Sequence, residues 1–159
     1  MGSGISGLYI GTHGSTYSIG SLDYMSEQDT FSINIKKRKD VDPGEYLDIV
    51  AHGDEKHILI KHKASTATLS HNSFARLLKE TGAVTKKKIR LLSCNTGAIS
   101  RGFAQGLADR LNIEVLAPKG YVAVDKYGNY AAYKGHYHNG QLVLDKKVDF
   151  VTYYPNGGK

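Results

Sequence analysis

The segment YLDIVAHG at residues 46–53 and the segment IRLLSC at residues 89–94 decide the fold of this chain. Each is a short run of apolar residues, which is typical of a buried strand. The first run ends at His52-Gly53 and the second at Cys94. One strand–helix crossover separates them, which predicts neighbouring parallel strands with both side chains at the same edge of the sheet.

Weaker patterns predict the elements on either side. Residues 31–35 alternate with a period of two, which is typical of a half-buried strand, and residues 58–69 indicate a short hairpin. The elements that follow are expected to be a helix capped by Ser70 or Asn72 and ended by Gly82, a second helix beginning near Ile99, and a strand at residues 114–117.

The 159 residues are expected to form a single α/β domain. It would consist of an N-terminal arm that is irregular or a hairpin (1–30), a three-layer core with a mostly parallel sheet flanked by helices (31–120), and an antiparallel β-ribbon (121–159). No apolar run approaches the length that crosses a bilayer, so no membrane span is expected. The first residues, MGSG, lack the regions of a signal peptide, and we interpret the chain as a fragment of a longer protein.

The net charge of +6 comes largely from two basic runs. Acidic residues follow the first run, residues 36–39, almost at once, which indicates a solvated face rather than a nucleic-acid groove. The second run, Lys86, Lys87 and Lys88, has no acidic residue close to it in the sequence. These three lysines are therefore the candidate anion-binding residues.

Cys94 is the candidate nucleophile and His52 the candidate base. The thiolate is the reactive form of cysteine, so Cys94 needs a base or a positive potential nearby. His52 would supply the base, and the N-terminus of the helix expected near Ile99 would supply the potential. In the alternative interpretation Cys94 is only a small buried hydrophobic residue, but core packing gives no reason for both residues to follow a strand.

The remaining sites are weaker. His13-Gly14 is a second His-Gly pair, but glycine interrupts the segment before it, so His52 is preferred. His136 and His138 alternate on one predicted strand without an acidic or cysteine partner and are interpreted as surface residues. Because the chain has one cysteine, we expect no internal disulfide and no metal site.

A strand ending in His-Gly, followed by a strand ending in Ser-Cys, resembles the caspase-like cysteine peptidases, which include caspases, legumain, gingipains and clostripain. Residues 49–53 (IVAHG) and 91–94 (LLSC) carry the match. The chain is most similar to the self-processing cysteine protease domains of large bacterial RTX and clostridial toxins. The likeness continues through the segments GFAQGLAD, VLAP and VAVDKYG, at residues 102–109, 115–118 and 122–128. It covers about residues 45–130, and the order and spacing of its short motifs carry it.

The resemblance implies a caspase-like fold and a Cys-His dyad without a third carboxylate. Cys94 would attack a carbonyl carbon and His52 would transfer protons between nucleophile and leaving group. The backbone N–H groups of Gly53 and Cys94 would hold the oxyanion, each such donor supplying about 2.7–4 kcal/mol.

The toxin domains bind inositol hexakisphosphate in a basic pocket that includes their terminal β-ribbon. The ribbon here offers only Lys119, Lys126 and Lys134, and the strongest basic run lies before the cysteine strand. We therefore expect no required cofactor.

The leading hypothesis is a thiol protease module of a bacterial toxin or effector that acts on peptide or protein substrates. Such a module would be secreted or delivered within a larger chain and would act in the cytosol of a target cell. An immunity protein would be a further partner. Two alternatives stay open. The same dyad would act on an acyl group carried by RNA, such as charged tRNA, for which the basic charge is the only argument. A caspase-like fold could also serve as a non-catalytic binding module.

Overall fold

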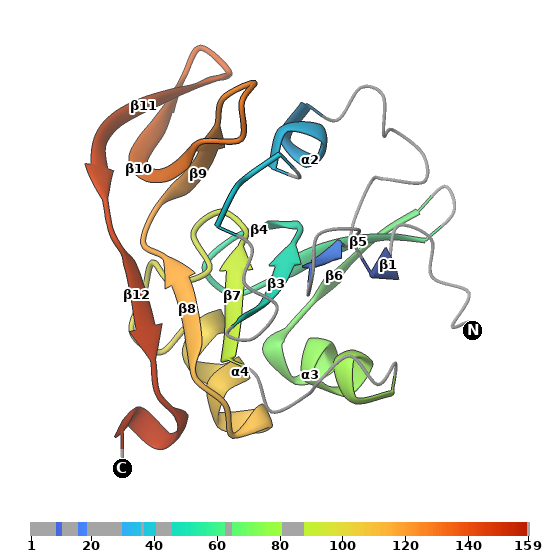
Figure 1. Ribbon diagram of the computed structural model, residues 1–159. Coiled ribbons are helices and arrows are strands. Elements are labelled where there is room, and N and C mark those ends of the chain that lie inside the picture. Colours follow the sequence, from blue (N-terminus) through green and yellow to red (C-terminus); the bar gives the residue numbers. More distant parts are fainter. Residues whose placement is uncertain are drawn as a thin grey trace.

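The structure is a computed structural model that describes residues 9–10, 16–18, 30–35, 37–40, 46–62, 65–80 and 88–158 (Figure 1). Its main sheet has six strands in the order β1-β2-β3-β7-β8-β12. The three inner pairings are parallel and the two edge pairings are antiparallel. The strands are β1 (Tyr9–Ile10), β2 (Thr16–Ser18), β3 (Tyr46–Val50), β7 (Lys88–Leu92), β8 (Val115–Pro118) and β12 (Phe150–Tyr153). The chain therefore has the predicted α/β class, with a mixed sheet.

Two smaller antiparallel sheets accompany the main sheet. One joins β4 (His52–Gly53), β5 (Ile58–His62) and β6 (Ser65–Leu69), and the other joins β9 (Tyr121–Val124), β10 (Tyr130–His138) and β11 (Gln141–Val148). These strands confirm the hairpins predicted at residues 58–69 and beyond Tyr121. Asn139 and Gly140 connect β10 to β11 with φ angles of 52° and 79°, the conformation that a tight two-residue hairpin turn requires.

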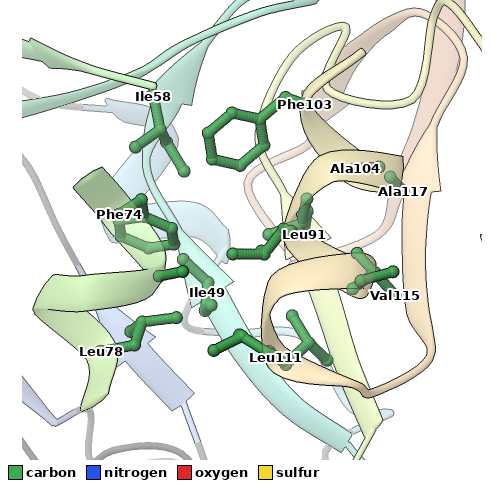
Figure 2. Packing of buried hydrophobic residues seen from close by; sticks show 14 of the residues in the cluster. Ile49, Ile58, Phe74, Leu78, Leu91, Phe103, Ala104, Leu111, Val115 and Ala117 are labelled. Atoms are coloured by element: carbon green, nitrogen blue, oxygen red, sulfur yellow. The ribbon is translucent and has the colours of Figure 1, made fainter. Parts of the chain in front are cut away.

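Two helices cover one face of the main sheet (Figure 1). They are α3 (His71–Glu80) and α4 (Phe103–Leu111). The strand pleat turns alternate residues of β3 and β7, among them Ile49 and Leu91, toward these helices. Figure 2 shows these two side chains packed beside Phe74 of α3 and Phe103 of α4, whose ring centroids are 5.8 Å apart, and all four side chains are fully buried. This cluster is the main hydrophobic core.

The opposite face carries a different layer. The short helix α2 (Thr30–Ile35) places Ile35 against Val50 and Leu92, and Val124 and Tyr130 pack against the same cluster. The third layer is therefore built from one short helix and the β9–β10–β11 sheet. The prediction of a strand at residues 31–35 is wrong, because Phe31 and Ile35 are also four residues apart and so share one face of a helix.

The N-terminal arm and the second helix can be compared with the predictions. The arm at residues 1–30 is predicted to be irregular or a hairpin, and it contributes β1 and β2, an antiparallel pair, to the main sheet. The second helix was expected near Ile99 but begins at Phe103, and turns and bends occupy residues 93–102. The Ser70 cap of α3 is confirmed, since the Ser73 N–H donates to Ser70 Oγ at 3.3 Å. The predicted cap at Gly82 lies outside the described residues.

The chain ends in a short 3₁₀ helix, η1 (Pro155–Gly158), which lies beside α4. Within the described ranges no helix has the length and apolar character to span a membrane.

Candidate functional site

Adjacent parallel strands bring the two candidate catalytic residues to one edge of the main sheet. The Cα partners across β3 and β7 include Val50 and Leu92, the last residues of the two strands. His52 and Cys94 each follow two residues later. The prediction that both residues lie at the carboxyl ends of neighbouring strands is therefore confirmed.

A tight turn at the end of β7 holds Cys94. Asn95 adopts the left-handed conformation, with a φ of 61°, which asparagine tolerates better than most residues. Its N–H donates to the Gly120 carbonyl at 2.8 Å. The turn is thereby attached to the β8–β9 connection.

Gly97 fixes the far side of this turn. Its N–H donates to the Pro118 carbonyl at 2.8 Å, and its own carbonyl accepts the hydroxyl of Tyr153 at 2.6 Å. A Cβ at this position would lie 2.8 Å from the Ala117 carbonyl oxygen, so the close approach requires glycine. The turn after the cysteine is thus held from β8 and from β12.

The Cys94 sulfur lies against the backbone at the start of β9. The Val122 N–H points at Sγ with an N···S distance of 3.3 Å, and the Val122 carbonyl oxygen lies 3.9 Å from Sγ. Burial raises the pKa of the Cys94 thiol, although N–H groups of Val122 and of Cys94 itself oppose this effect. This environment therefore favours the neutral thiol over the thiolate.

His52 is exposed and lies beside helix α2. Its ring centroid is 5.9 Å from that of Phe31, at an interplanar angle of 41°. Phe31 packs against the apolar cluster under α2, which also receives Val124 from β9. Val122, whose backbone contacts the Cys94 sulfur, lies two residues before Val124 on the same strand.

The loops that carry the two residues touch each other at Gly53. A Cβ at Gly53 would lie 2.5 Å from Ser93 Oγ and 3.1 Å from the methyl group of Thr96. Ser93 is fully buried, and its hydroxyl has no hydrogen-bond partner in the part of the chain that the structure describes. The His-Gly segment therefore rests directly on the residue before the cysteine.

Helix α4 joins the same two loops through its first N–H groups. The Phe103 N–H donates to the Glu55 carbonyl at 2.9 Å, and the Ala104 N–H donates to the Thr96 carbonyl at 3.1 Å. These two hydrogen bonds position the loops that carry His52 and Cys94. That the positive end of this helix acts on the thiol stays a prediction.

The proposed anion-binding run is not confirmed. Lys88 forms an ion pair with Glu114 at 3.6 Å, an acidic residue that is distant from it in the sequence. It also begins β7, whereas Cys94 follows the other end of that strand. Lys86, Lys87 and the second His-Gly pair at His13 lie outside the described residues.

The ribbon histidines also differ from expectation. His136 Nδ1 lies 3.1 Å from a carboxylate oxygen of Asp145 on the neighbouring strand β11, so an acidic partner is present. Both His136 and His138 are exposed, as predicted. Nowhere in the described ranges do three His, Cys, Asp or Glu side chains form a group that could hold a metal ion.

Three residues of the site were not singled out from the sequence. Tyr153 anchors the cysteine turn, Ser93 supports Gly53, and the Glu55 carbonyl binds the start of α4. Ser93 directly precedes the candidate nucleophile, so its position in the sequence could have drawn attention to it. Tyr153 reaches the site only because β12 pairs with β8, and the Glu55 contact depends on a backbone atom.

The comparisons with known proteins identify a family. A search of curated proteins found no match. Residues 20–132, well over half of the chain, match the family described as a domain of unknown function (DUF8616). The match includes both candidate catalytic residues and the strands that carry them. The chain therefore belongs to the DUF8616 family.

Proposed function

We propose that this protein is a cysteine hydrolase with a caspase-like fold, in which Cys94 is the nucleophile and His52 the general base. The observation that carries the proposal is the parallel pairing of β3 with β7, which puts His52 and Cys94 two residues beyond the paired Val50 and Leu92. The contact between Gly53 and Ser93 supports the proposal, because it packs the segment that carries His52 against the residue that precedes Cys94.

The neutral thiol defines how the reaction would begin. His52 would accept the Cys94 proton as the sulfur attacks the carbonyl carbon, so that proton transfer accompanies formation of the S–C bond. The N–H groups of Gly53 and Cys94 would stabilise the tetrahedral oxyanion. His52 would then donate its proton to the leaving nitrogen as the C–N bond breaks, and water would hydrolyse the thioester.

Peptide bonds are the proposed substrate, on the strength of the resemblance to toxin protease domains. In that setting the domain would act in a target-cell cytosol as part of a larger toxin, and an immunity protein would bind it in the producing cell. We propose no required cofactor. Acyl groups carried by RNA are the less favoured substrate, because one of the three lysines proposed for phosphate binding is already paired with Glu114.

The first prediction is that Cys94 prefers a peptidyl acyloxymethyl ketone over iodoacetamide more strongly in the native protein than in the urea-unfolded chain, as measured by the ratio of the two labelling rates. His52→Ala should remove this preference, because the base no longer assists the attack. Mass spectrometry of the labelled protein gives both rates directly, since Cys94 is the single cysteine.

His13→Ala, which removes the other His-Gly pair, is the matched control and should label like the wild-type protein. Equal labelling of His52→Ala and wild-type protein would contradict the dyad. Hydrolysis of charged tRNA without cleavage of peptides, with a rate that falls steeply as salt rises, would instead favour the RNA-linked substrate.

A further inference from the structure

Exposed apolar side chains gather on the β10–β11 hairpin. Tyr137 is 65% exposed, and Leu142, Val143 and Leu144 are each about 40% exposed. The hairpin lies on the opposite side of the main sheet from α3 and α4, and its tip projects beyond the sheet (Figure 1). Such a concentration on one element typically marks a contact surface.

Strand pairing sorts these side chains onto two faces. Tyr137 is directly opposite Leu142, and Gly135 is directly opposite Leu144, so Tyr137, Leu142 and Leu144 share one face. Tyr121 of β9 joins them, with its ring 6.5 Å from that of Tyr137 in an edge-on arrangement. These four side chains form what we call the outer ribbon face.

Neighbouring side chains cover Gly135 in the middle of this face. A Cβ there would lie 3.1 Å from the Tyr121 ring and 3.2 Å from the end of Leu142, so those two side chains converge above the glycine. The reverse side of the hairpin is polar around Val143, where His136 pairs with Asp145. Only one face of the hairpin is therefore suited to apolar contact.

The outer ribbon face begins at the candidate nucleophile. Tyr121 immediately precedes Val122, whose N–H contacts the Cys94 sulfur. The neighbouring Gly120 carbonyl accepts the Asn95 N–H, so the root of the ribbon and the cysteine turn form one unit. A chain segment lying on the outer ribbon face would lead directly to Cys94.

We infer that the outer ribbon face is a substrate-binding surface that holds an extended, apolar segment of a protein substrate next to the scissile bond. This inference rests on the proposed function and adds a substrate class to it, namely unfolded or flexible protein segments. Exposed lysines on β11, Lys146 and Lys147, favour acidic residues beside the apolar segment.

The test compares two faces of the same hairpin. Fluorescein-labelled β-casein, an unfolded protein with apolar and acidic stretches, is titrated with the Cys94→Ala protein, which binds without cleaving. Introducing Leu142→Ser and Leu144→Ser together into the Cys94→Ala protein should raise the Kd for β-casein at least tenfold, which corresponds to about 1.4 kcal/mol. Val143→Ser removes an apolar side chain of similar exposure from the reverse face and should leave the Kd unchanged.

Equal weakening by Val143→Ser, or unchanged binding in the double-leucine variant, would overturn the inference. The inference would also be overturned if sedimentation velocity showed a dimer that the two leucine substitutions dissociate. The outer ribbon face would then be the interface between two copies of the chain. Thermal unfolding of each variant checks that the fold is intact. A short peptidyl ketone that reaches only the thiol tests the dyad separately, so failure of the hydrolase and failure of the outer ribbon face give different results.

Discussion

At the scale of single residues, the chemistry of Cys94 depends on burial. The raised pKa means that folding favours the neutral thiol, so the thiolate forms at a higher pH in the native protein than in the unfolded chain. We predict that the pH profile of iodoacetamide alkylation has its midpoint above the ordinary cysteine value of 9.0 and returns to that value in urea. A native midpoint below neutrality would show a preformed thiolate and would contradict the proposed order of proton transfer.

The same raised pKa has a consequence for stability. The contribution of the neutral Cys94 thiol to the free energy of unfolding is fully present below the pKa of this thiol in the unfolded chain. It is lost as pH rises through the pKa of the thiol in the folded protein. Wild-type protein should therefore lose stability relative to Cys94→Ala above about pH 9 in urea unfolding.

Gly53 and Ser93 form a second residue-scale test. Gly53→Ala should cost about 1–3 kcal/mol of unfolding free energy, because the new Cβ would meet Ser93 Oγ at 2.5 Å. Ser93→Ala should be nearly neutral, since it removes a buried hydroxyl that has no partner among the described residues. The double variant should recover part of the loss, and urea unfolding of the four proteins measures the coupling. Strict additivity would show that these two loops do not press on each other.

At the scale of elements, a buried ionic network holds the third layer on the sheet. Asp48 of β3 accepts hydrogen bonds from Arg38, which follows α2, and from Arg90 of β7, at distances between 2.7 and 3.0 Å. Arg90 extends the network to Asp40, which also accepts the Tyr130 hydroxyl of β10 at 2.6 Å. The network thus connects β3, β7, β10 and the segment after α2 through the carboxylates of Asp48 and Asp40.

Asp48→Asn should therefore destabilise the protein by about 3–5 kcal/mol, because two buried guanidinium groups lose their shared charge partner. Asp40→Asn is the matched control: its side chain is half exposed, so its loss should cost about 1 kcal/mol or less. Chemical denaturation measures both. Similar losses from the two variants would contradict the central place of Asp48 in the network.

At the scale of the whole molecule, the sequence predicted the strands and hairpins better than the long-range contacts between them. The strands ending at His52 and Cys94, the β5–β6 hairpin and the Asn139-Gly140 turn could be recognised because local periodicity and turn chemistry specify them. The helix at residues 30–35 was misread because its apolar spacing suits both a strand and a helix, and burial against Val50 and Leu92 decides between them. The pairing of Lys88 with Glu114 was missed because it joins the start of β7 to the residue before β8, which is distant in the sequence.

The candidate site divides in the same way. The sequence by itself determined its two chemical groups and their placement at one sheet edge, because parallel strands joined by a crossover bring their carboxyl ends together. Only the tertiary structure decided the environment of each group: the β9 backbone against the Cys94 sulfur, Phe31 beside His52, and Ser93 beneath Gly53. These contacts join segments far apart in the chain, and long-range packing rather than local periodicity sets their distances.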